Sequence, residues 1–255
     1  MTVRPSNLRE TLLGGAQTLG AFLFLGSPDV AEVMAVAGFP ILIVDREHVA
    51  ADNATALAEL RAIRSVSDAF AMVRTRDNTP GAIKPMLDAG FDGIMVADIR
   101  AAEEARAIAE AARYAPMGRR GAHFTVSRAA RYGFDVARHP ENANRNILVC
   151  AMIESREGLE NIDAIAAVEG IDMLFLGPLD LTADYGTFGD LASPELSDAL
   201  RKAEAKITQC RKLLGGAALP GDTPAELFAR GYSLVTGASD VGILREGALK
   251  YIQCK

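Results

Sequence analysis

Two carboxylates, Glu154 and Asp180, each follow a short apolar run of the kind that forms a buried parallel strand. The runs cover residues 147–153 (ILVCAMI) and 173–176 (MLFL), and residues 155–168 between them read as a helix. A strand, a crossover helix and a parallel strand bring both strand ends to the same edge of a sheet. Carboxylate oxygens are ligands that hard divalent cations prefer. The spacing therefore predicts that Glu154 and Asp180 bind a divalent metal.

Other charged residues follow further apolar runs in the same way. Asp45, Glu47 and His48 come after residues 41–44, Arg74 comes after 69–73, and Asp98 comes after 93–96. In a barrel of parallel strands, the rim at the C-terminal ends of the strands is where active sites form. A polar rim also arises simply because strands end at the surface, and for any single residue this alternative stays open. Together the residues predict an active site at this rim.

The elements that must position these residues alternate regularly along the chain. Residues 113–146 interrupt the alternation and predict either a functional segment or short helices of its own. Eight strand–helix units predict an α/β fold, a (β/α)8 TIM barrel in a single domain, residues 1–255. A doubly wound open sheet is the alternative, and it is disfavoured because no glycine-rich dinucleotide fingerprint follows the first strand. The predicted strands are 21–25, 41–44, 69–73, 93–96, 147–153, 173–176, 216–219 and 233–236. The predicted helices are 7–14, 29–37, 53–68, 80–89, 101–112, 155–168, 193–214, 223–230 and 239–253.

Composition excludes several classes of function. The net charge of −6 excludes a basic nucleic-acid-binding footprint. No apolar run approaches the ~18 residues of a membrane span, and the first residues have no signal-like apolar stretch, so we expect a cytoplasmic protein. The cysteines are odd in number and scattered, which disfavours a disulfide framework and a zinc finger. They are Cys150, Cys210 and Cys254.

Missing residues narrow the chemistry further. No lysine lies at a predicted strand end, which argues against a Schiff-base mechanism. His123 and His139 fall in the irregular segment, away from the strand ends, so a zinc cluster is disfavoured. A serine nucleophile lacks its GxSxG context. Chemistry with a hard divalent metal remains.

Several motifs in this order resemble the HpcH/HpaI aldolase family, the metal-dependent class II aldolases that act on pyruvate. The resemblance extends from about Gly14 to Leu249. The motifs are Asp45-Arg-Glu-His48, Arg74 with Asn78-Thr-Pro80, Leu87-Asp88-Ala-Gly90, Arg113-Tyr-Ala-Pro-Met-Gly-Arg-Arg-Gly121, Ile153-Glu154-Ser-Arg156 and Gly177-Pro-Leu-Asp180-Leu.

The resemblance implies a role for each rim residue. Glu154 and Asp180 would bind Mg²⁺, Mn²⁺ or Co²⁺, which a ketoacid would also chelate, and the metal would stabilise the enolate left by C–C cleavage. Arg74 would stabilise the same oxyanion, with a rim salt bridge as the alternative. His48 would be the general base and Asp45 would hold its ring, with a capping contact at a helix start as the alternative for His48.

The resemblance also bears on substrate binding and assembly. Backbone N–H groups of the segment Gly177, Pro178 and Leu179 would bind the substrate carboxylate at a helix start. Asp88 would reach the site of a neighbouring subunit, which implies a homo-oligomer, a hexamer arranged as a trimer of dimers.

Three positions depart from the family pattern. Met152 stands where many relatives carry glutamine, Arg46 stands where many carry a small residue, and Asp98 adds a carboxylate that could pair with Arg46 or Arg100. We expect these residues to affect specificity and not to abolish catalysis.

The resemblance predicts an aldehyde-lyase of class EC 4.1.2. It would cleave 4-hydroxy-2-oxoacids reversibly to pyruvate or hydroxypyruvate and an aldehyde. The alternatives are a lyase of the citrate-lyase-β or malyl-CoA type and a non-catalytic ketoacid-binding barrel.

Overall fold

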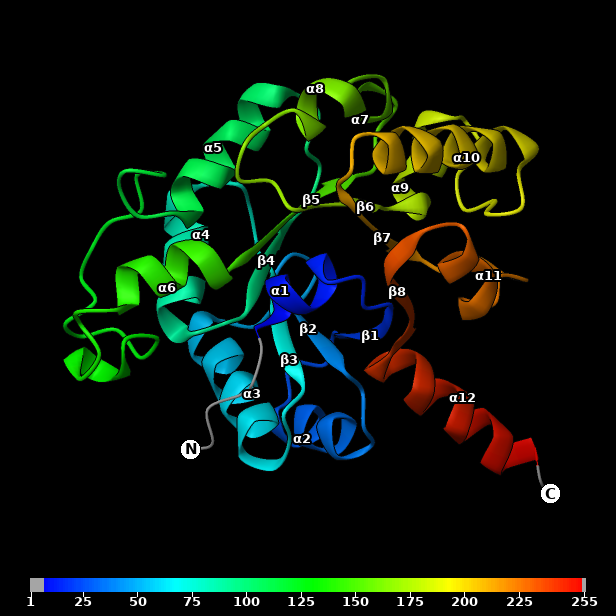
Figure 1. Ribbon diagram of the computed structural model, residues 1–255. Helices are drawn as coiled ribbons and strands as arrows, with labels where there is room; N and C mark the ends of the chain where they lie inside the picture. Colours follow the sequence, from blue (N-terminus) through cyan, green and yellow to red (C-terminus); the bar gives the residue numbers. More distant parts are fainter. Residues whose placement is uncertain (1–6, 254–255) are drawn as a thin grey trace.

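Eight parallel strands close one barrel in chain order, with β8 paired to β1 (Figure 1). The computed structural model describes residues 7–253, so Cys254 lies outside the described residues. The predicted TIM barrel is confirmed. The strands are β1 Thr18–Leu23, β2 Ile41–Asp45, β3 Phe70–Arg74, β4 Gly93–Val96, β5 Leu148–Ile153, β6 Met173–Leu176, β7 Leu213–Ala217 and β8 Tyr232–Ser239.

Helices follow the strands and surround the barrel, while α1 places Leu8 and Leu12 among the side chains of the barrel interior. The segment predicted to be irregular contains one 3₁₀ turn, Arg131–Gly133, and the short helix α6. The helices are α1 Leu8–Leu13, α2 Pro28–Val36, α3 Asn53–Val66, α4 Pro80–Ala89, α5 Ala102–Ala112, α6 His139–Asn146, α7 Arg156–Glu160, α8 Ile162–Ala166, α9 Pro178–Asp184, α10 Pro194–Gln209, α11 Pro224–Ala229 and α12 Asp240–Gln253.

Two predicted helices were wrong in extent. The helix predicted at 155–168 is broken at Asn161, whose φ of −91° and ψ of 7° separate α7 from α8. The helix predicted at 193–214 ends early, because Arg211 adopts a left-handed φ of 57° and the chain then enters β7.

The strand predicted at 216–219 instead begins at Leu213 and includes Gly215 and Gly216. Both glycines lie against neighbouring strands. A Cβ on Gly215 would lie 2.7 Å from Cδ2 of Phe175, and one on Gly216 would lie 2.6 Å from Cε1 of Tyr232. These glycines therefore serve close packing inside a strand and do not mark its boundary.

The barrel interior is rich in sulfur. Met72, Met95, Met152 and Met173 come from four neighbouring strands, β3 to β6, and pack with Phe22 and Phe175 in one buried cluster. Successive side chains of a strand point to opposite faces. The alternation that turns Met72 and Met152 inward also turns Arg74 and Glu154 inward, one step nearer the C-terminal rim.

The last helix, α12, extends away from the barrel (Figure 1). Its large apolar side chains are largely exposed, with fractions of 63% for Leu244, 81% for Tyr251 and 65% for Ile252. A helix in a folded protein gains most of its stability by packing an apolar face against other elements. This face is therefore suited to contact another surface.

Helix α3 buries a carboxyl group against the barrel wall. Glu59 is 2% exposed and its Oε1 atom has no hydrogen-bond partner. Burial, with a contribution from the charge of Asp240, raises the pKa of Glu59 to about 7. The folded protein therefore holds this proton more tightly than the unfolded chain does.

We expect Glu59→Gln to flatten the pH dependence of stability between pH 5 and pH 8. A carboxyl whose pKa is raised by folding contributes stability below its unfolded pKa, and this contribution is lost as the pH rises through about 7. The wild type should lose on the order of 2–3 kcal/mol more than the variant across this window. Urea unfolding at pH 5 and pH 8 measures this difference. An equal change in the free energy of unfolding between the two pH values in both proteins would contradict the prediction.

Candidate active site

Asp45 and Arg74 form a buried ion pair at the rim. They are paired in register at the ends of β2 and β3, and Nε of Arg74 donates to Oδ1 of Asp45 at 2.5 Å. The guanidinium also lies 5.0 Å from the ring centroid of Phe22 and 5.8 Å from that of Phe24. Two aromatic faces and a carboxylate thus hold Arg74 in one orientation.

Glu47 joins Arg74 to His48. One oxygen of Glu47, Oε2, lies 3.1 Å from Nη1 of Arg74 and 3.7 Å from Nε2 of His48. The sequence placed Glu47 at the rim without giving it a role, although it lies within the same motif as Asp45 and His48.

The prediction that Asp45 holds the His48 ring was wrong. Oδ2 of Asp45 accepts from the backbone N–H of His48 at 2.9 Å, so Asp45 fixes the turn that carries His48. The imidazole is 63% exposed and lies beside Glu47. The carboxylate in a position to support a charged His48 is therefore that of Glu47.

Glu154 is buried at the end of β5 and held from two sides. Its Oε1 accepts from the backbone N–H of Asp98 at 2.8 Å, and Asp98 adopts a left-handed φ of 52°. A Cβ on Gly177 would lie 2.6 Å from Oε2 of Glu154. The absence of a side chain at position 177 therefore makes room for the carboxylate of Glu154.

Asp180 lies in the first turn of α9, exposed at the rim, and its charge acts on both Glu154 and Glu47. Burial raises the pKa of Glu154 to about 7, and the charges of Glu47 and Asp180 add to this rise. Burial also raises the pKa of Glu47, against the lowering effect of Arg74. The charges of Glu47 and Asp180 thus both act on Glu154, whereas the sequence paired Glu154 with Asp180 alone.

This set of donors fits a hard divalent cation. All three acids offer oxygen ligands, and Oε2 of Glu47 is buried, with an ion pair to Nη1 of Arg74 at 3.1 Å. A cation would offset the effect of burial, and of the neighbouring negative charges, that raises the pKa values of Glu154 and Glu47. Within residues 7–253, no group of three or more His, Cys, Asp or Glu side chains is arranged to hold a metal ion. A site built on Glu154 and Asp180 thus leaves coordination positions for substrate and water.

The predicted carboxylate-binding segment is only partly available. The backbone N–H of Gly177 donates to the carbonyl of Ile153 at 3.0 Å, and Pro178 has no N–H. The prediction for these two residues was wrong, because Gly177 continues the ladder between β5 and β6. Leu179 keeps a first-turn N–H at the start of α9.

A sequence model of the HpcH/HpaI aldolase/citrate lyase family matches residues 18–246. The chain belongs to this family. Membership confirms the prediction of a carbon–carbon lyase of the aldolase type. It also agrees with the barrel and with the charged rim described above.

Similar proteins cover nearly the whole chain. A 5-keto-4-deoxy-D-glucarate aldolase from Shigella boydii is 33% identical over 255 residues, covering 98% of this chain and 96% of that protein. One from Escherichia coli K12 is 33% identical over 253 residues, covering 97% and 96%.

Two solved structures are also similar. An HpcH/HpaI aldolase/citrate lyase family protein from Burkholderia cenocepacia has a TM-score of 0.89 at 32% identity, covering 96% of this chain and 97% of that one. The citrate synthase SbnG has a TM-score of 0.87 at 27% identity, covering 97% and 96%.

The three departures from the HpcH/HpaI pattern occupy different places. Met152 is buried in the barrel interior, below Glu154. Asp98 pairs with Arg100, whose Nε lies 2.7 Å from Oδ1, so one of the two expected partners is confirmed. Arg46 points out of the barrel, toward α3 and α4.

Asp88 lies in the last turn of α4 and pairs within its own chain. Nη2 of Arg120 donates to Oδ1 of Asp88 at 2.6 Å, and the Arg120 guanidinium stacks 4.5 Å from the ring centroid of Tyr114. Helix α4 starts at the catalytic rim and runs away from it. The reach of Asp88 into a neighbouring subunit's site stays a prediction.

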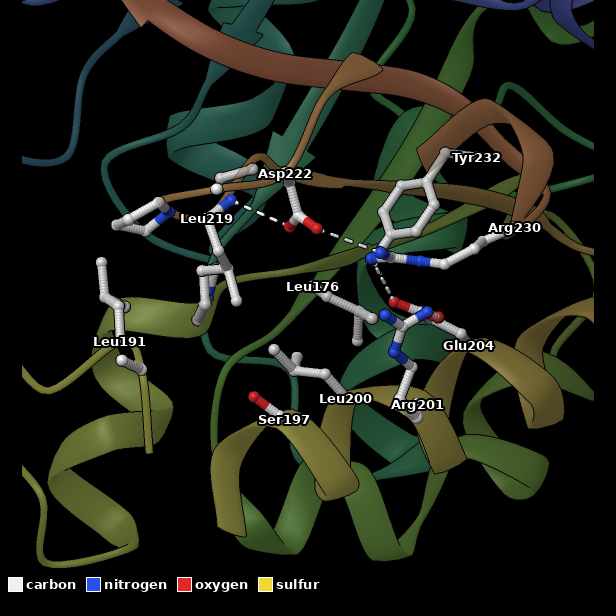
Figure 2. Close-up of a pocket in the computed structure, with 15 residues that line it drawn as sticks. Leu176, Leu191, Ser197, Leu200, Arg201, Glu204, Leu219, Asp222, Arg230 and Tyr232 are labelled. Carbon is white, nitrogen blue, oxygen red and sulfur yellow. Dashed lines mark hydrogen bonds and ion pairs between the residues drawn. The ribbon is translucent and has the colours of Figure 1, made fainter. Parts of the chain in front are cut away.

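A cavity of about 310 Å³ lies outside the barrel, near α10 and α11 (Figure 2). Arg230 is held there by Glu204 at 2.9 Å and by Asp222 at 3.1 Å, and the hydroxyl of Tyr232 donates to Glu204 at 2.9 Å. Arg201, whose Nη1 lies 3.7 Å from Oε2 of Glu204, adds a second positive charge that balances the two acids. The cluster joins α10 to the segment between α11 and β8, and the cavity is also lined by Leu176 and Pro178 at the end of β6.

Proposed function

We propose that this chain is a divalent-metal-dependent aldolase that cleaves 4-hydroxy-2-oxoacids to pyruvate, or hydroxypyruvate, and an aldehyde. The observation that carries the proposal is the convergence of Glu154, Glu47 and Asp180 beside Arg74 and His48 at the barrel rim. Glu154 and Asp180 would hold Mg²⁺, Mn²⁺ or Co²⁺, with Glu47 close by. Such a cation supplies Lewis-acid polarisation of the 2-keto group.

The side chains supply the proton and charge steps. His48 removes the proton from the 4-hydroxyl, and the C3–C4 bond breaks as C4 becomes the aldehyde carbonyl. The bond electrons pass toward the 2-keto oxygen, where the fixed guanidinium of Arg74 stabilises the negative charge of the enolate. Return of a proton to C3 gives pyruvate. Glu47, 3.7 Å from Nε2 of His48, supports the imidazolium between these steps.

5-Keto-4-deoxy-D-glucarate is the first substrate to test, because curated relatives are named as its aldolases. Numbered from its other carboxylate, this sugar acid is a 2-oxo-3-deoxy acid with a 4-hydroxyl group. It therefore has the bond that the proposed chemistry breaks. N–H groups at the start of α9, including that of Leu179, would bind the carboxylate beside the keto group.

Excess EDTA is expected to lower pyruvate release from this substrate to below about 1% of the starting rate, because polarisation of the keto group is lost. Added Mg²⁺, Mn²⁺ or Co²⁺ should restore it. A coupled assay for pyruvate gives the measurement, and unchanged activity in the presence of EDTA would contradict the metal mechanism.

Cleavage of malyl-CoA without turnover of free hydroxyketoacids would favour the citrate-lyase-β type. Binding of pyruvate without turnover of any aldehyde would favour a non-catalytic barrel.

We further propose a cytoplasmic homo-oligomer, a hexamer arranged as a trimer of dimers. The exposed apolar face of α12 supports self-association. No helix within residues 7–253 is long and apolar enough to cross a membrane.

Light scattering of the wild type should give the mass of an oligomer, whereas the double variant L244E/I252E should give a smaller species.

Mixing two inactive variants, Asp88→Asn and Glu154→Gln, should restore part of the activity if Asp88 contributes to the active site of a neighbouring subunit. A monomeric wild type, or no recovery on mixing, would contradict the corresponding part of the proposal.

A further inference from the structure

Arg46 is a buried arginine whose charge lacks hydrogen-bond partners. It follows Asp45 at the end of β2, so the alternation of the strand turns its side chain away from the catalytic rim. Only 7% of the residue is exposed, and neither Nε nor Nη1 has a hydrogen-bond partner. Burial lowers the pKa of this guanidinium. An unpaired buried charge is costly, so this side chain favours an anionic ligand.

Arg46 lines a small cavity between the first turns of two helices. The cavity has a volume of about 70 Å³, and Asn53 at the start of α3 and Gly81 and Ala82 at the start of α4 also line it. Both helices are long enough to carry a dipole, and each presents its positive end to this space. The position thus combines a buried guanidinium with two helix N-termini.

A second arginine lies beside Arg46 in this cavity. Arg76 also lines the cavity. Its side chain is 75% exposed, and its Nε lies 3.3 Å from Oδ2 of Asp77. Three acids act on the charge of Arg46, and none of them makes a hydrogen bond to its Nε or Nη1. Asp45 is committed to Arg74, Asp52 caps α3 through Thr55, and burial holds Glu59 partly protonated near pH 7.

We propose that this cavity binds a small inorganic oxyanion of the size of phosphate or sulfate, held by Arg46 and by N–H groups at the starts of α3 and α4. The volume is about twice the ~30 Å³ that one water molecule takes up in the liquid. It therefore has room for a small tetrahedral ion. The site lies behind β2 and β3, on the opposite face from Asp45 and Arg74, and it does not depend on the proposed aldolase activity.

The test is the unfolding temperature of the full chain in phosphate, sulfate or chloride at matched ionic strength. Phosphate and sulfate should give a saturable rise of roughly 3–6 °C that chloride does not give. Arg46→Gln should remove the rise. Arg119→Gln should keep it, because Arg119 is an exposed arginine paired with Glu110 far from the cavity.

A second variant guards against misfolding of Arg46→Gln. Gly81→Asp has room for its side chain, since a Cβ there meets only Oγ1 of Thr79 at 3.7 Å. A carboxylate in the first turn suits the helix dipole and would occupy the cavity. This variant should unfold at a higher temperature in chloride and show no response to phosphate.

Calorimetric titration with phosphate should give one site per chain in the wild type and none in the two cavity variants. Glycerol 3-phosphate binding as tightly as phosphate would support the oxyanion site and assign it to a phosphoryl group on a longer molecule. A wild type without any response, or a full response in both cavity variants, would overturn the proposal.

Discussion

Glu154→Gln is expected to lower kcat/KM by about 10³-fold, equivalent to ~4 kcal/mol of transition-state stabilisation. Glutamine keeps the shape of the side chain and can still accept from the N–H of Asp98. It loses the negative charge that a divalent cation requires. The substitution therefore tests the charge of Glu154 and leaves its position unchanged.

Folding and metal binding should respond differently to this change. Removal of a buried charge should leave the unfolding temperature of the metal-free protein unchanged or higher. Calorimetric titration with Mn²⁺ should show a loss of affinity of at least about tenfold. Glu103→Gln on the surface of α5 is the matched control. A wild-type turnover rate in Glu154→Gln would show that Glu154 is not a metal ligand.

Arg74→Lys should lower kcat by about 10²–10³-fold, with a smaller change in KM. Arginine reaches Asp45 and Glu47 at once through different nitrogens while it lies over Phe22. A lysine ammonium is a single point and cannot bridge both carboxylates in this geometry. The positive charge is kept, but its fixed orientation toward the developing oxyanion is lost.

Steady-state kinetics of Arg74→Lys and Arg76→Lys separate this role from a general effect of charge. Arg76 lies two residues further along the chain with an exposed side chain, and its replacement should change kcat less than about twofold. A rim salt bridge without a catalytic role predicts a lower unfolding temperature in Arg74→Lys with kcat retained. That result would show that Arg74 has a structural role and no catalytic role.

Most of the barrel could be predicted because its strands are short apolar runs, several of which end at or just before a charged residue. Asp45, Arg74 and Glu154 were placed at the rim for the same reason. The start of β7 was predicted too late, and Gly215 and Gly216 lie inside the strand, where Phe175 and Tyr232 approach the backbone. A single sequence gives no information on such contacts between neighbouring strands.

Partners across strands were the least predictable part of the site. Asp45 was expected to hold the ring of His48, three residues away in the chain. The register of β2 and β3 instead sets Asp45 directly beside Arg74. Likewise, Ile153 pairs with Leu176, so the next residues, Glu154 and Gly177, come into contact. Both outcomes depend on register, which local patterns specify only in part.

The four methionines beneath the rim give the site an adaptable floor. Thioether side chains are unbranched, and they fill irregular space without requiring a hydrogen bond. Exchange of one for leucine costs less than about 1.5 kcal/mol in typical cores. Because each methionine comes from a different strand, the packing beneath the rim can be altered one strand at a time, while the charged residues at the rim stay unchanged.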